Sequence, residues 1–219
     1  SIKSHTNGSL TYGAVRDVVS NLTADAALNA GKGNYVTGNH AIQVQDSASV
    51  SDLNILDAVT TGVISASVSD TAEQLSGLTG TNNRYTVNVT GGATVSLLNQ
   101  IDAKTTGVIT ASINAAASDL VGLTSTTNNY AVTVNTVATV DQLTKIDAAT
   151  VGALNYTTVR DSAVNLVADA IKGNNSGLYV TGTHAVEVTD QASNVSYEQL
   201  NAIDQATSGV ITASISGSA

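Results

Sequence analysis

The fold is decided by the stretch Gly107-Val-Ile-Thr-Ala-Ser-Ile113. Its apolar residues, at positions 109, 111 and 113, alternate with hydroxyl-bearing side chains, which is the period of a half-buried β-strand. The same pattern recurs as Gly62-Val-Ile-Ser-Ala-Ser-Val68 and Gly209-Val-Ile-Thr-Ala-Ser-Ile215, and in degenerate form as Gly152-Ala-Leu-Asn-Tyr-Thr-Thr158. A strand that returns at a regular interval predicts a repeat protein.

The repeat has two nested spacings. Ile64, Ile109 and Leu154 lie 45 positions apart, and steps of 22 and 23 residues divide that interval, as from Val87 to Ile109 and from Ile109 to Val132. Each step has room for one strand and one short helix. Much of residues 16–46 reappears 144 positions later, so the order is long, short, short, long. We predict a polar lead-in over residues 1–9 and a single solenoid over residues 10–219. The solenoid comprises a long repeat over residues 10–63, short repeats over 64–108 and 109–153, a long repeat over 154–208 and a terminal open strand over 209–215.

The predicted fold class is an α/β repeat, a one-sided right-handed parallel β/α solenoid of 22–23-residue strand–helix coils. Short strand–helix–strand connections give parallel neighbouring strands joined by right-handed crossovers. The strands are apolar on one face only, whereas a sheet covered by helices on both faces would need strands that are apolar on both. The alternative is a right-handed β-helix in which the helical segments are turns.

Composition limits the chemistry and the partners. The 219 residues include no Cys, Pro, Met, Phe or Trp, and the formal net charge is −9. The lack of Cys excludes disulfides, thiolate zinc sites and a cysteine nucleophile. The negative charge argues against nucleic acid and anionic membranes as partners. No apolar run is long enough for a membrane helix, so no membrane insertion is expected. The start at Ser1 suggests processing or a segment of a longer chain.

Several coils resemble a known repeat class. Asp70-Thr-Ala-Glu-Gln-Leu75 and Asp161-Ser-Ala-Val-Asn-Leu166 are similar to the Asp-Thr-Ala-x-Asn-Leu coils found in tandem in very large bacterial surface and type I-secreted proteins. The segment Val95-Ser-Leu-Leu-Asn-Gln-Ile-Asp-Ala-Lys-Thr-Thr-Gly107 resembles their companion segment. The resemblance covers nearly the whole chain from Leu10 onward. It implies S-layer, adhesin or filament material outside the cell, at the bacterial surface. The chain lacks the Gly-Gly-x-Gly-x-Asp calcium nonapeptides that often accompany such repeats.

Aspartates at recurring positions are the candidate ion ligands. One recurs near the end of each longer predicted helix, at Asp57, Asp102, Asp147 and Asp204. A single carboxylate per coil favours a structural role, a hydrogen bond to the backbone or turn of a neighbouring coil, over a ladder of calcium ligands. Asp46 and Asp190, with Ser, Gln and Thr nearby, are the other candidates. We predict no cofactor, with calcium as the open alternative.

The two histidines in the long repeats are the candidate catalytic groups. His40 and His184 end the two insertions that the short repeats lack. Catalysis needs a nucleophile or paired carboxylates within reach, and a residue duplicated 144 positions away does not suit one active site. A turn or packing role is therefore favoured, and no catalytic, cofactor-binding or metal-binding residue is predicted. With Tyr35 and Tyr179, the histidines are predicted to mark a lateral contact, because insertions in solenoids project from one edge.

The two ends of the solenoid suggest self-association. The last strand carries Ile211, Ala213 and Ile215 with no helix after it, and the first carries Leu10 and Tyr12. An uncovered strand edge favours pairing with another chain. We predict a non-enzymatic extracellular structural protein whose partner is itself, as a homopolymer assembled head to tail into a bacterial surface filament or layer. The alternative is a glycan- or ice-binding adhesin module that uses the flat Ser/Thr/Asn face of the sheet.

Overall fold

The computed structural model describes residues 10–215, so the predicted lead-in over residues 1–9 lies outside the described part. The chain divides into two compact units, Ser1–Ala111 and Ser112–Ala219. The first unit contains β1 (Ala14–Asp17), α1 (Val19–Ala26), α2 (Leu28–Gly31), β2 (Ala41–Ala48), α3 (Val50–Asp57), β3 (Ile64–Thr71), α4 (Ala72–Leu75), β4 (Arg84–Gly92) and α5 (Val95–Asp102). Strand β5 (Ile109–Ala115) crosses the boundary.

The second unit continues the alternation of strands and helices. It contains α6 (Ala117–Leu120), β6 (Asn129–Val134), α7 (Val140–Ala148), β7 (Leu154–Asn155), β8 (Thr158–Asp161), α8 (Ala163–Ala170), α9 (Lys172–Asn175), β9 (Ala185–Val188), the 3-10 helix η2 (Ala192–Asn194), α10 (Tyr197–Ala206) and β10 (Ile211–Thr212).

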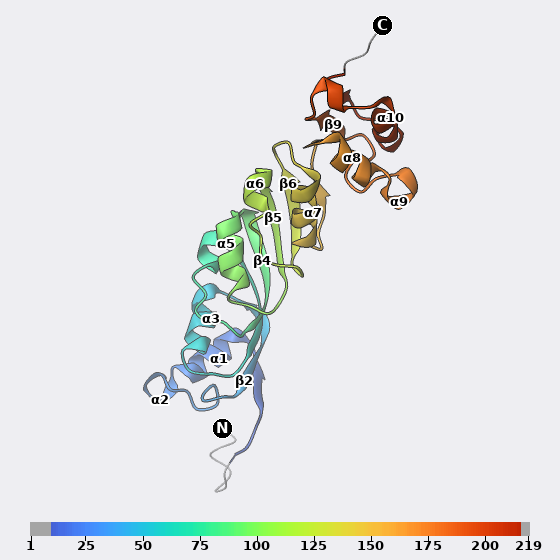
Figure 1. The fold of residues 1–219 in the computed structure, drawn as a ribbon. Coiled ribbons are helices and arrows are strands. Elements are labelled where there is room, and N and C mark those ends of the chain that lie inside the picture. Colours follow the sequence, from blue (N-terminus) through green and yellow to red (C-terminus); the bar gives the residue numbers. More distant parts are fainter. Residues whose placement is uncertain (1–9, 216–219) are drawn as a thin grey trace. The chain divides into compact units, whose positions relative to one another are not determined.

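The strands form an α/β architecture with an all-parallel sheet. Seven strands pair in the order β1-β2-β3-β4-β5-β6-β7, with helices between consecutive strands. In the first unit the register runs without interruption between β3 and β4, from Ser65 opposite Arg84 to Thr71 opposite Thr90. Figure 1 shows α1, α3 and α5 of this unit along the same side of its strands. The predicted parallel alternation of strand and helix is confirmed.

Strands β3, β4, β5 and β6 each bury one face, as the period-two pattern predicts. In β4, Tyr85, Val87 and Val89 are buried while Thr86 and Asn88 between them are exposed. The core is completed by helix residues three apart, such as the two buried positions of α5, Leu98 and Ile101. Residues three apart share a helix face, so a single apolar stripe suffices to cover the strands.

Strand pairing is interrupted between β7 and β8, which the sequence does not predict. Strands β8, β9 and β10 form a second, three-stranded parallel sheet in the order β10-β9-β8. The interruption falls in the degenerate copy of the motif, Gly152–Thr158. There Asn155 and Thr157 flank Tyr156, and β7 is only two residues long. The inward positions after Leu154 carry Tyr156 and Thr158 where β3 has Ala66 and Val68, and the ladder ends here.

Candidate functional site

A threonine hydrogen-bonded to the preceding strand recurs in both units and explains why the motif begins with Gly. Thr105 Oγ1 accepts from the backbone N–H of Tyr85 (2.7 Å) and of Gly107 (2.9 Å) and donates to Tyr85 O (2.9 Å). A Cβ on Gly107 would lie 2.2 Å from Tyr85 O, so only Gly permits this approach. Thr60, Thr150 and Thr207 make corresponding bonds. The sequence signal is Thr-x-Gly, which the strand pattern alone does not single out.

The aspartates near the helix ends bind the neighbouring turn where the structure records their contacts. Asp57 accepts from the Thr79 hydroxyl (2.9 Å) and from Asn83 Nδ2 (3.0 Å). Asp147 accepts from the Tyr179 hydroxyl (3.3 Å), and Asp204 is exposed. For Asp57 and Asp147 the predicted structural role is confirmed.

Asp46 and Asp190, the other candidate ion ligands, bind helix N-termini. Asp46 Oδ1 accepts from Val19 N–H at the start of α1 (2.7 Å), and Asp190 Oδ2 accepts from Ala163 N–H at the start of α8 (2.5 Å). A carboxylate is favoured there because the first helical N–H groups lack intrahelical acceptors and carry partial positive charge. Within residues 10–215, no three His, Asp or Glu side chains gather as a metal site would require.

Each of the two histidines packs against a tyrosine. The first pair brings together His40, predicted to mark a lateral contact, and Tyr12, predicted to take part in assembly. The rings of His40 and Tyr12 stack with centroids 4.0 Å apart, and the Tyr12 hydroxyl donates to Tyr35 O (2.9 Å). His184 and Tyr156 repeat this stack at 4.0 Å, and Tyr156 donates to Tyr179 O. The predicted packing role of the histidines is confirmed.

Burial makes the tyrosine hydroxyls of these clusters weaker acids than usual. Loss of solvent raises the pKa of Tyr156 from 10.0 to about 12, with further contributions from the charges of Asp169, Tyr179 and Asp147. The pKa of Tyr12 is raised as well, chiefly by burial. Because deprotonation places a phenolate among carboxylates, the neutral form is the one that fits the folded protein.

This pKa shift predicts a loss of stability at alkaline pH. A pKa raised on folding stabilises the folded protein fully below the unfolded value of 10.0, and that stability is lost as pH rises toward about 12. We expect Tyr156→Phe to reduce the fall in unfolding free energy over this interval, measured by urea denaturation at several pH values. Tyr197→Phe is the control, because that side chain is 79% exposed. An unchanged pH dependence in Tyr156→Phe would contradict the assignment.

The predicted assembly residues lie at half-buried or exposed positions near the beginning and the end of the described residues. Leu10 and Tyr12 are half-buried, as are Ile211 and Ala213, and Ile215 is exposed. The last three line a hollow of about 420 Å³ together with Tyr197, Leu200, Asn201 and Asp204. This end of the second unit therefore presents apolar side chains to solvent.

Comparison of the chain with protein-family models, curated proteins and solved structures finds no match. Over residues 10–215, no helix combines the length and the apolar character needed to cross a bilayer. The function is therefore inferred from the geometry of the chain itself.

Proposed function

We propose that this chain is a non-enzymatic structural protein of the bacterial cell surface that assembles head to tail, each copy a one-sided right-handed parallel β/α solenoid. The observation that supports this proposal is a contact between two segments inside the second unit. Segments similar to each of these two occur at the beginning and at the end of the described residues, where they are less buried. The polymer is therefore expected to reuse a contact that the chain already makes within itself.

The junction inside the second unit joins the segment at 138–155, which contains α7, to the segment at 158–161. Ala138 N–H donates to Thr158 O (3.2 Å), and Arg160 N–H donates to Ala138 O (2.8 Å). Val140 N–H, at the start of α7, donates to Asp161 Oδ2 (3.1 Å). Two backbone hydrogen bonds and one to a carboxylate thus fix the register of the two segments.

Both sides of this junction have counterparts elsewhere in the chain. Residues 138–155 correspond to 195–212, 57 positions later, including the capping boxes Thr139/Gln142 and Ser196/Gln199. Residues 158–161 correspond to 14–17, 144 positions earlier. We call Ala14, Val15 and Asp17 the head face, and Val195, Tyr197 and Leu200 the tail face.

Burial differs between the junction and its counterparts. Ala138, Leu143 and Val159 are 1%, 0% and 0% exposed. Their counterparts Val195, Leu200 and Val15, in that order, are all only half-buried. Burying apolar area is favourable by about 25 cal/mol per Å², so covering the tail face with the head face of a second copy is expected to be favourable.

The internal junction specifies the contacts of the proposed interface. Val195 N–H should donate to Ala14 O of the next copy, and Arg16 N–H should donate to Val195 O. Tyr197 N–H should donate to Asp17. Asp17 already accepts from Val18 N–H and Asn21 Nδ2. Asp161 has the corresponding bonds from Ser162 and Asn165, and it still accepts from Val140 N–H.

Two variants, one on each face, test this arrangement. Val15→Asp places an uncompensated charge on the head face, and Val195→Asp does so on the tail face. We expect the parent chain to form polymers that grow with concentration in sedimentation velocity, and each variant alone to stay monomeric. Mixing the two variants should give dimers and nothing larger, because each contributes one intact face.

The control is Val210→Asp. Val210 is 74% exposed, and Ala153, its counterpart in the internal junction, is exposed as well, so this side chain is not part of the junction. The control should assemble like the parent, and circular dichroism should confirm that all three variants fold. A monomeric parent at high concentration, or a mixture of the variants without dimers, would refute head-to-tail assembly.

A further inference from the structure

Two arginines lie in one row across the exposed face of the first unit. The pairing registers place Arg16 of β1 opposite Gln43 of β2, Gln43 opposite Ser65 of β3, and Ser65 opposite Arg84 of β4. Three steps of about 4.8 Å between neighbouring strands separate the outer Cα atoms by about 14 Å. The row therefore carries a positive charge at each end and neutral hydrogen-bonding groups between.

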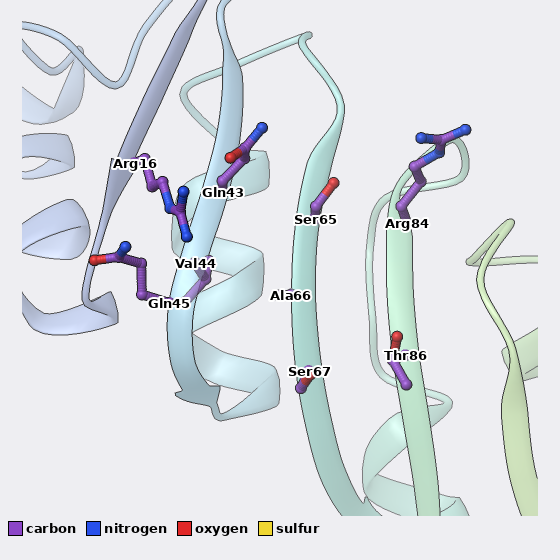
Figure 2. A pocket seen from close by; sticks show the side chains of 9 residues that line it. All are labelled: Arg16, Gln43, Val44, Gln45, Ser65, Ala66, Ser67, Arg84 and Thr86. Atoms are coloured by element: carbon purple, nitrogen blue, oxygen red, sulfur yellow. The ribbon is translucent and has the colours of Figure 1, made fainter.

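The row lies in a shallow depression of about 430 Å³, lined also by Gln45, Ser67 and Thr86. Figure 2 shows these side chains on four neighbouring strands, with Arg16 and Arg84 on the outer two. Strand β2 is irregular here, because the register shifts between Gln43 and Ser47. Gln45 lines the same depression because it is two residues after Gln43, and alternate residues of a strand share a face.

The second unit shows how such an arginine is neutralised. Arg160, 144 positions after Arg16, forms an ion pair with Glu187. The residue at the position of Glu187 in the first unit is Gln43, which carries no charge. Among residues 10–215, neither Arg16 nor Arg84 forms an ion pair.

Nearby carboxylates are held by the first helix. Asp17 accepts from Val18 N–H (2.8 Å), and Asp46 accepts from Val19 N–H (2.7 Å), both at the start of α1. Because neither guanidinium group pairs with a carboxylate among residues 10–215, both remain available to an anion from solution.

We propose that this depression binds an acidic saccharide chain, with carboxylates or sulfates at Arg16 and Arg84 and hydroxyl groups on the polar side chains between. Guanidinium groups bind carboxylates and tetrahedral oxyanions through paired N–H donors. Gln and Ser side chains donate and accept, as sugar hydroxyls do. A single small anion cannot reach both arginines across about 14 Å. A densely charged polyanion is disfavoured by the net charge of −9, whereas a saccharide with spaced charges is not.

Calorimetric titration with three probes tests the ligand class. The probes are an oligosaccharide in which hexuronate residues are separated by neutral sugars, a neutral oligosaccharide of equal length and inorganic sulfate. We expect the acidic oligosaccharide alone to bind measurably, with affinity that falls at high salt. Equal binding of the neutral oligosaccharide would overturn the role of the arginines, and sulfate binding as tight as the oligosaccharide would overturn the saccharide.

Gln43→Glu is the decisive variant, because it places beside Arg16 the acid that Glu187 provides beside Arg160. The second unit accommodates this pair, so folding should be unaffected. We expect Gln43→Glu and Arg84→Gln each to weaken binding about tenfold or more, the scale of one charge-assisted hydrogen bond. Thr133→Glu, on the exposed face of β6 in the second unit and opposite the uncharged Asn155, is the charge-matched control and should bind like the parent. Unchanged affinity in both Gln43→Glu and Arg84→Gln would refute the site.

Discussion

Replacing Asp169 by Ala is expected to lower the free energy of unfolding of the second unit by about 3–5 kcal/mol, the scale for removing one partner of a buried charge interaction. Asp169 is 0% exposed, and its Oδ2 accepts from the N–H groups of Leu178 (3.2 Å), Tyr179 (2.8 Å) and Val180 (2.8 Å). The Nζ atom of Lys172 lies 3.6 Å from Oδ1. The Ala variant would leave three N–H groups unpaired where water cannot readily replace the carboxylate.

The loop around Asp169 depends on this carboxylate for its shape. Gly177 has φ +65°, and a Cβ there would lie 2.0 Å from Val180 O. Asn174 and Asn175 also have positive φ, a conformation that is uncommon for residues other than Gly, although Asn adopts it more readily than most. A backbone held in this way relies on contacts such as the three hydrogen bonds to Asp169.

The first unit supplies a matched control. Asp25 makes the same three hydrogen bonds, to Asn34, Tyr35 and Val36, but is only half-buried. Water can reach its partners, so Asp25→Ala is expected to cost about 1–3 kcal/mol. Urea denaturation measures both losses, and hydrogen exchange at the amides of residues 178–180 should accelerate in Asp169→Ala. If Asp25→Ala proved as costly as Asp169→Ala, burial would not be the cause.

The sequence predicts those parts of the fold in which the polarity of each residue indicates whether its side chain is buried or exposed. The alternation in Ile109–Ala115 identifies a half-buried strand, and the spacing of Leu98 and Ile101 identifies the apolar face of a helix. These patterns depend on a residue being apolar or polar, which is visible at once. They also predict the parallel order, because the connections between strands are short.

The candidate site was less predictable because its partners are backbone groups or distant strands. Asp169 bonds to three N–H groups nine to eleven residues away, and nothing in the residue types marks such a contact. Predicting that Arg16 and Arg84 lie in one row requires the register of four strands, which the periodicity of the sequence does not determine. The 144-residue echo could have indicated it, since Arg160 faces Glu187 where Arg16 faces Gln43.

Thr150→Val is expected to lower the free energy of unfolding by about 2–4 kcal/mol, because it preserves the shape of the side chain while removing its hydroxyl. Thr150 Oγ1 accepts from the N–H groups of Tyr130 and Gly152, both at 2.9 Å, and donates to Tyr130 O at 2.9 Å. The valine methyl group would leave two N–H donors without this acceptor. Each buried, unpaired donor costs about 1–3 kcal/mol.

The nearby geometry prevents the strand from recovering these bonds by moving. A Cβ on Gly152 would lie 2.3 Å from Tyr130 O, so the two backbone segments already approach as closely as Gly allows. Tyr130 is fully buried, and a shift of its strand would displace its side chain from the core. We therefore expect the variant to lose stability and not to relax into an equivalent arrangement.

Thr150→Ser and Thr133→Val separate the hydroxyl from the other consequences of substitution. Serine keeps the hydroxyl and removes one methyl group, so its cost should be about 0.8 kcal/mol. Thr133 is exposed on β6 of the same unit, and its replacement by Val should change stability by less than about 0.5 kcal/mol. Urea denaturation of the three variants gives the comparison. A Thr150→Val variant no less stable than Thr150→Ser would show that the hydroxyl does not hold the turn to the preceding strand.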